Sequence, residues 1–224
     1  MERHFEQELD KLNRRVLKMA VMASDQVGRA MEALINCDTE LAENIIEADI
    51  KLDELDVKID KLCQRIFALT QPVATDLRLI MSSLKLNNDL ERMGDLAVSI
   101  AKKIEGISGF KDIIEELHID ELAVSTSNLV KDVVQLLNSR QTVLIGDIFN
   151  ASKEIKQKNR AISNQIIEKM MEKSDVVVVA TNLVIILTHI ERIAGYCSNI
   201  AESVVFIVEG KIIKHSHKGD KTQP

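Results

Sequence analysis

One spacing pattern constrains the fold of this chain more than any other feature. Between residues 41 and 69, apolar side chains recur at alternating steps of four and three: Leu41, Ile45, Ala48, Leu52, Leu55, Ile59, Leu62, Ile66 and Leu69. A second segment repeats the spacing with Leu79, Ser83, Leu86, Leu90, Met93, Ala97, Ile100 and Ile104. This period places the side chains of each segment on one face of a long helix and predicts left-handed bundle packing.

The chain also repeats part of itself one hundred residues later. Leu90–Met93 (LERM) returns as Ile190–Ile193 (IERI), and SIA at 99–101 returns as NIA at 199–201. Breaks are sparse, the clearest being Pro72 and the Gly-containing stretch at 106–110. We therefore predict an all-α fold of two tandem three-helix bundles that pack against each other, with six long helices. The first unit covers 1–108, and the second covers 109–224 and ends in a polar, frayed tail.

Composition excludes several other classes of protein. Two prolines, eight glycines, no tryptophan and 46% hydrophobic residues in 224 favour long helices. A net charge of −6 argues against nucleic-acid binding. Cys37, Cys63 and Cys197 form no CxxC pair, which indicates free thiols in a reducing cytoplasm. The N-terminal segment has no apolar stretch typical of a signal peptide, and the longest apolar run, 176–187, is too short to span a bilayer.

A stripe of acids lies beside the apolar face. One position along from the first pattern, the residues are Ala42, Ile46, Asp49, Asp53, Asp56, Asp60, Cys63 and Phe67. The second segment has a similar stripe of Leu84, Asn88, Glu91, Asp95 and Val98. If both stripes face the same side, up to six carboxylates gather on one surface. Like charges about 6 Å apart at an effective dielectric of about 20 repel by about 3 kcal/mol, so such a surface needs solvent, basic partners or cations.

Three interpretations of this stripe remain open. It can be a solvated acidic face. It can be neutralised internally or by a partner through Arg78, Lys85 and Arg92, which recur every seven residues. It can also hold a hard cation such as Mg²⁺, Mn²⁺, Ca²⁺ or ferric iron, because all its donors are oxygens. No catalytic motif or phosphate-binding loop accompanies it, and His189 is interpreted as a buried histidine with satisfied hydrogen bonds.

Three segments carry a resemblance to a known family: IIEADIKLDELDVKID (45–60), QPVATDLRLIMSSLKLNNDLERMGD (71–95) and ERIAGYCSNIAESVVFIVEGK (191–211). With these, the chain resembles the PhoU family, accessory regulators of the bacterial high-affinity phosphate transporter. The resemblance implies a non-catalytic, cytoplasmic regulator, often a homodimer, that reaches the membrane through partners. Those partners would be the transporter's ATP-binding subunit and the phosphate-sensing histidine kinase. When phosphate is plentiful, such a protein restrains the transporter and keeps the starvation response off.

The resemblance also implies metal. Family members carry E/D-x-x-x-D motifs that can hold a multinuclear cluster in each repeat, and the first repeat here matches at Asp49/Asp53 and Glu91/Asp95. We expect a cluster of Fe, or of Zn, Mn or Mg, on these four, with Asp56, Asp60 and Asn88 as further candidate ligands.

The second repeat departs from the motif. Glu191 remains, but Gly195 replaces the acid, and Lys153, Lys156, Lys158 or Arg160 falls where Asp49 and Asp53 sit in the first repeat. We therefore predict that the second site is lost. Two alternative functions stay open: a carboxylate-based metal store or metalloenzyme, and a structural helical adaptor unrelated to phosphate.

Overall fold

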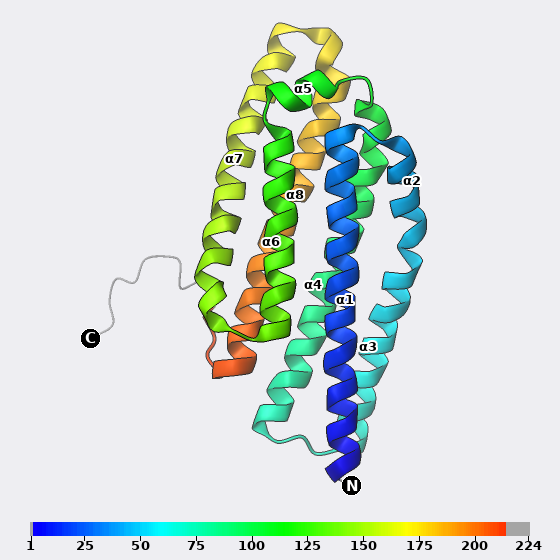
Figure 1. Cartoon of the computed structure of the whole chain (residues 1–224), viewed down its shortest axis with the longest axis vertical. Helices are drawn as coiled ribbons and strands as arrows, with labels where there is room; N and C mark the ends of the chain where they lie inside the picture. The colour runs from blue at the N-terminus through cyan, green and yellow to red at the C-terminus, as the bar shows by residue number, and fades with distance from the viewer. Residues whose placement is uncertain (1, 214–224) are drawn as a thin grey trace, which may run out of the picture.

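The computed structural model describes residues 2–213 and contains no strand in that range, which confirms the all-α fold class (Figure 1). The helices of the first half are α1 (Glu2–Asn36), α2 (Thr39–Ala48), α3 (Ile50–Leu69), α4 (Ala74–Ile104) and the 3₁₀ turn η1 (Glu105–Ile107). Those of the second half are α5 (Lys111–Glu116), α6 (Ile119–Ser139), η2 (Thr142–Leu144), α7 (Ile145–Glu172), η3 (Ser174–Val176) and α8 (Val177–Glu209). The tail that we expect to be frayed, 214–224, lies outside the described residues.

The predicted tandem of three-helix bundles is confirmed. In the first bundle, α1 packs on α3 and α4, while α6, α7 and α8 pack on one another in the second. The bundles meet through α1 with α6 and α4 with α8, so that the long helices lie side by side (Figure 1). Leu12 and Met93 of the first half and Leu129 and Ile190 of the second belong to one continuous buried core. Burial of this shared apolar surface holds the two repeats together.

Two of the six predicted long helices are divided in the structure. The helix expected after the break at 106–110 is split into α5 and α6, where His118 has φ 54°. The segment from residue 38 to 69 reads as a single helix in the sequence, whereas the structure divides it into α2 and α3 at Asp49. Asp49 keeps helical dihedral angles (φ −60°, ψ −36°), so the chain continues in about the same direction. Its carbonyl accepts from the Leu52 amide at 2.8 Å, a 3₁₀-type bond that tightens the turn. Leu69, which the apolar period assigns to the core, is 72% exposed because α3 ends there beyond the packed face.

Helix α8 is the central helix of the second bundle. By length and composition alone it could span a membrane, and it is the one such helix among residues 2–213. Here it packs against α4, α6 and α7, and Ile186, Ile190 and Ile193 are fully buried. A core helix of a folded bundle has the same apolar composition, so the packing accounts for the pattern.

Helices α4 and α8 pack antiparallel along most of their length. The Asp89 side chain hydrogen-bonds to Asn199 and the Arg92 side chain to Tyr196, while Gly106 lies against Asn182. Equivalent residues of the two helices stand 100 positions apart (91 to 191), so an approximate twofold axis relates them. The second half therefore contributes residues to the surroundings of the first half's polar face.

The three cysteines are free, as predicted. Cys63 and Cys197 are buried in the core, and Cys37 is half-buried with its thiol 3.6 Å from the Ile107 carbonyl oxygen. Burial raises the pKa of the Cys63 thiol to about 12 and raises that of Cys197 as well. Such thiols are protonated and packed as apolar groups, which gives them a structural role.

Candidate ion-binding site

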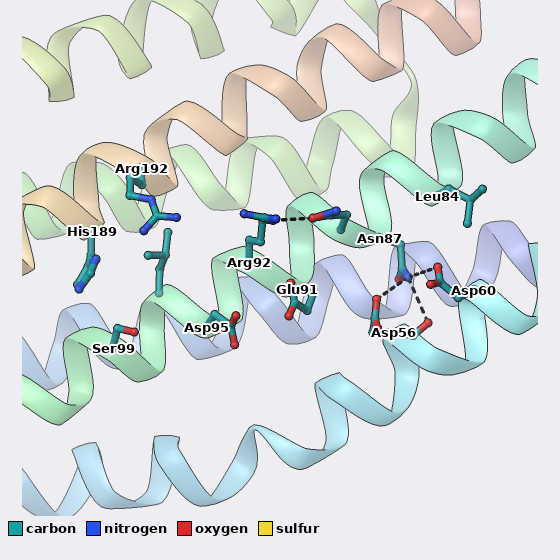
Figure 2. A pocket seen from close by; sticks show the side chains of 12 residues that line it. Asp56, Asp60, Leu84, Asn87, Glu91, Arg92, Asp95, Ser99, His189 and Arg192 are labelled. Carbon is teal, nitrogen blue, oxygen red and sulfur yellow. Dashed lines mark hydrogen bonds between the residues drawn. The ribbon is translucent and has the colours of Figure 1, made fainter.

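A cavity of about 700 Å³ lies between α3, α4 and α8 (Figure 2). Its walls are formed by Asp56, Asp60, Leu84, Asn87, Asn88, Glu91, Arg92, Asp95, Leu96, Ser99, His189 and Arg192. Five of the seven residues that the sequence analysis names as metal ligands are in this lining. The predicted face is therefore a hollow between two helices, roofed in part by the second repeat.

Asn87 organises the acidic wall of the cavity. It is 1% exposed, and its Nδ2 group donates to the Asp56 carboxylate at 2.7 Å, to the Asp60 carboxylate at 3.1 Å and to the Asp56 carbonyl at 3.1 Å (Figure 2). Its own Oδ1 is buried without a partner. Sequence analysis missed Asn87, although a polar residue next to the core position Leu86 was the available signal.

The carboxylates on the two helices raise one another's pKa. Burial, followed by the charges of Asp95 and Asp56, raises the pKa of Glu91 to about 7. Burial and then the neighbouring Asp60 and Asp53 carboxylates raise the pKa of Asp56. These mutual effects show that the stripes on α3 and α4 face each other, with negative charge concentrated between them.

Close helix packing positions the end of the acidic stripe that contains Asp49 and Asp53. Burial, then Asp49 and Asp95, raises the pKa of Asp53, so these three carboxylates are neighbours. The Gln26 side chain, 7% exposed on α1, donates to the Asp49 carboxylate at 2.8 Å. A Cβ on Gly94 would lie 2.4 Å from Leu52 Cδ2, so a larger residue there would force Leu52 to shift where α4 approaches α3 beside Asp95.

The chemical type of these donor atoms suits a hard cation. The carboxylates are all oxygen donors, and no ion pair within 4 Å in residues 2–213 involves Asp49, Asp53, Asp56, Asp60, Glu91 or Asp95. Within the same range, however, no three acidic, histidine or cysteine side chains are close enough to surround one ion. Asp53 and Asp95 are exposed, so their side chains have room to turn toward the others. The arrangement thus supplies suitable ligands in an open geometry.

The three basic candidates do not form one row: Lys85 and Arg92 flank Asp89, whereas Arg78 lies near the end of α8. Arg78 sits over Gly210 near the end of α8, and Lys85 lies beside Asp89 and lines a neighbouring hollow with Glu202. Arg92 donates to Asn88 Oδ1 at 2.7 Å and also hydrogen-bonds to Tyr196. Of the three, only Arg92 lines the acidic cavity.

The wall opposite the acids is basic. Figure 2 shows His189 and Arg192 extending from α8 toward the cavity, near Ser99 of α4. The interpretation of His189 as a satisfied, buried histidine is wrong: it is half-buried, and its buried Nδ1 atom has no hydrogen-bond partner. Burial, then the positive charges of Arg192 and Lys103, lowers the pKa of its imidazole.

The second repeat has different chemistry at the equivalent place. The buried positions of the first acidic helix segment recur 103 positions later (42 to 145) in α7. The first set is Ala42, Ile45, Leu52, Ile59 and Cys63, and the second is Ile145, Ile148, Ile155, Ile162 and Ile166. This register puts Ser152, Lys156 and Asn159 where Asp49, Asp53 and Asp56 stand.

The contacts of these residues agree with the register. The Asn159 Nδ2 group donates to Glu191 at 3.3 Å, and Lys156 Nζ lies 4.0 Å from the point where a Cβ on Gly195 would be. Ser152 donates to the Ala194 carbonyl at 2.7 Å. A lysine ammonium therefore occupies the space beside Glu191 and Gly195, where the first repeat has carboxylates.

Two three-helix repeats with a polar face between their second and third helices define a duplicated helical-bundle class. The model for the PhoU domain matches the chain twice, at residues 16–104 and 119–204, and the chain belongs to the PhoU family. The two matched segments cover the two bundles described above.

Several relatives span nearly the whole chain. It is 31% identical to a phosphate-specific transport system accessory protein PhoU homolog of Clostridium acetobutylicum, over 92% of this chain and 95% of that protein. The homolog of the same name in Rhizobium meliloti is 32% identical, over 92% and 87%. The crystal structure of PhoU from Pseudomonas aeruginosa superimposes with a TM-score of 0.85 at 28% identity, covering 92% of this chain and 100% of that one. The phosphate transport system regulatory protein PhoU of Streptococcus pneumoniae gives 0.82 at 29%, covering 94% and 99%.

Proposed function

We propose that this chain is a non-catalytic regulator of phosphate uptake and of the phosphate-starvation response. It acts in the cytoplasm as a homodimer and binds the ATP-binding subunit of the phosphate transporter and the phosphate-sensing histidine kinase when phosphate is plentiful. The observation that carries the proposal is the family match in both repeats, together with relatives named as accessory proteins of phosphate-specific transport.

A surface suited to protein contacts adds support. At the turn between α3 and α4, Leu69 is 72% exposed, Val73 is 69% exposed and Leu77 is 37% exposed. Exposed apolar side chains that gather at one place are typical of protein-binding surfaces. Val73 and Leu77 belong to the segment 71–95, on which the resemblance to the family is most specific, and Leu69 lies just before it.

The first-repeat carboxylates are the proposed cation site. Asp49, Asp53, Glu91 and Asp95 hold the metal, with Asp56, Asp60 and Asn88 nearby, and bound Fe, Zn, Mn or Mg would supply positive charge between α3 and α4. The mutually raised pKa values of Asp53, Asp56 and Glu91 support this proposal, because a cation would relieve their repulsion. The lysine at the equivalent point of the second repeat supports a single site per chain.

Partner binding is the test of the regulatory proposal. Purified chain would be immobilised and exposed separately to the transporter ATP-binding subunit and to the cytoplasmic part of the kinase from the same organism. We expect both to bind, and we expect a Leu69→Ser/Val73→Ser variant to bind at least one of them more weakly. A Val143→Ser variant is the control, because Val143 is equally exposed, at 78%, but lies outside that turn. Failure of both partners to bind the wild-type chain would reject the proposal.

Metal content tests the cation site separately. Elemental mass spectrometry on untagged protein, purified without chelators, would compare wild type with an Asp49→Asn/Asp95→Asn variant. We expect near-stoichiometric metal in the wild type and its loss in the variant. Wild-type protein that stays empty after incubation with Fe, Zn, Mn and Mg would rule out the site while leaving partner binding untouched.

A further inference from the structure

The basic end of the cavity forms a cluster of its own. Lys103 near the end of α4 and Arg192 on α8 both act on His189, and His189 and Arg192 line the cavity together with Ser99 (Figure 2). The three basic side chains come from both repeats. Arg192 brings a permanent positive charge and several N–H donors to one end of a hollow that opens to solvent, and Lys103, which lies outside the lining, adds a second charge near His189.

No acid among the described residues pairs with this cluster. Within residues 2–213, no ion pair within 4 Å includes Lys103, His189 or Arg192. Arg92 is the only cation among the charges that shift the pKa of Glu91, so neither Lys103 nor Arg192 is paired with that carboxyl group. The lowered pKa of His189, caused by burial and then by Arg192 and Lys103, is the expected result of positive charge that nothing nearby balances.

The duplicated half provides an internal comparison. Arg92 is the counterpart of Arg192, and Asp89 is the counterpart of His189, each 100 positions apart. Asp89 is 7% exposed, and the charges of Lys85 and Arg92 act on its carboxyl group. The arginine of the first repeat thus has an acid beside it, whereas the arginine of the second has a histidine and a lysine. The positive charge of Arg192 is therefore not neutralised by an acid at the position where Asp89 stands in the first repeat.

We propose that His189, Arg192 and the Ser99 hydroxyl form a binding site for a phosphoryl oxyanion, with the charge of Lys103 supporting it from beside His189. The guanidinium group offers two parallel N–H donors to such an oxyanion, and the lysine adds a charge. The His189 side chain lines the same cavity and offers a ring N–H donor to the site. The ligand is either free inorganic phosphate or a phosphate monoester, since both present the same tetrahedral oxygens. The inference does not depend on the transporter or kinase as partners.

The neighbouring carboxylates affect how tightly this site can bind an anion. Glu91 and Asp95 line the same cavity, and their negative charge opposes an anion. Cations on those carboxylates would remove the opposition, so binding of the oxyanion should be tighter when Mg²⁺ is present. This coupling would make the occupancy of the two ends interdependent.

Isothermal titration calorimetry on the full chain tests the proposal. Inorganic phosphate and phosphoserine would be titrated separately into wild-type protein, in chelator and in excess Mg²⁺. Arg192→Gln and Lys103→Gln are the test variants. Lys102→Gln is the matched control, because Lys102 is the exposed neighbour of Lys103 and is not among the charges that act on His189. Far-ultraviolet circular dichroism would confirm that each variant keeps its helix content.

We expect wild type to bind at least one of the two probes in at least one condition. Each test variant should bind about tenfold more weakly, as loss of a charge-assisted hydrogen bond predicts, and Lys102→Gln should bind as wild type does. Binding of phosphate alone identifies the free ion as ligand, and binding of phosphoserine alone identifies a monoester. Absence of binding in every condition, or equal binding by Arg192→Gln, Lys103→Gln and wild type, overturns the proposal.

Discussion

A methyl group added to Gly94 tests the close packing that brings the acidic stripes together. In a Gly94→Ala variant the new Cβ would lie 2.4 Å from Leu52 Cδ2 and 3.1 Å from Gln26 Oε1. Leu52 is 2% exposed and Gln26 is 7% exposed, so neither can move out into solvent. Overpacking of a core typically costs about 1–3 kcal/mol, while alanine gains about 1 kcal/mol over glycine within a helix. The net expectation is a loss of about 0–2 kcal/mol.

Gly28→Ala supplies the control for that prediction. Gly28 lies within α1, and a Cβ there would have no atom within 4 Å, so the substitution should stabilise the protein by about 1 kcal/mol. The difference between the two variants isolates the packing cost, which should be about 1–3 kcal/mol. Urea unfolding followed by circular dichroism measures it, and in a chain of this size about 1 kcal/mol shifts Tm by about 2–4 °C. If Gly94→Ala proves as stable as Gly28→Ala, the close approach of α4 to α3 is refuted.

Three further predictions concern the polar face. Asn87→Ala should lower the free energy of unfolding by about 1–3 kcal/mol, because the Asp56 and Asp60 carboxylates lose a buried donor. Asn88 is exposed, so Asn88→Ala should change the free energy of unfolding little, and urea unfolding of both variants measures the difference. In chelator, the free energy of unfolding should fall as pH rises from about 4.5 toward 7. The pKa of Glu91 is about 7 in the folded chain, against an ordinary value of 4.5. The stability that Glu91 contributes is therefore complete below pH 4.5 and is lost as pH rises through the folded pKa. Glu91→Gln should flatten that slope, and an unchanged slope would contradict the pKa. Finally, Lys156→Asp/Gly195→Asp should add Mn²⁺ binding in calorimetry, whereas Gly195→Asp alone, left facing Lys156, should not.

The apolar period predicted the helices well because burial selects residues at a fixed helical spacing. It could not reveal the break at Asp49, since Asp49 keeps helical angles and the pattern passes through it unchanged. It also placed Leu69 in the core, because periodicity does not say where the packed face ends.

The site depended more on tertiary structure than the helices did. That the acids of α3 and α4 face each other follows from the packing permitted by Gly94, and no spacing rule contains that information. The amino-acid pattern left four basic residues as candidates for the place of Asp53, and the buried isoleucines of α7 select Lys156. The hydrogen bonds of Asn87 could not be predicted because its partner carboxylates lie on another helix, and the proximity of Lys103 to His189 could not because the two lie in different repeats.

The antiparallel packing of α4 and α8 affects how mutations in this protein can be mapped to one half or the other. Because the floor of the cavity is encoded near codon 90 and part of its roof near codon 190, neither half expressed alone would contain the complete pocket. A lesion mapped to the C-terminal half can therefore present as a defect of the N-terminal half. Truncation analysis would misassign such a residue, and complementation between two co-expressed halves is the experiment that would locate it correctly.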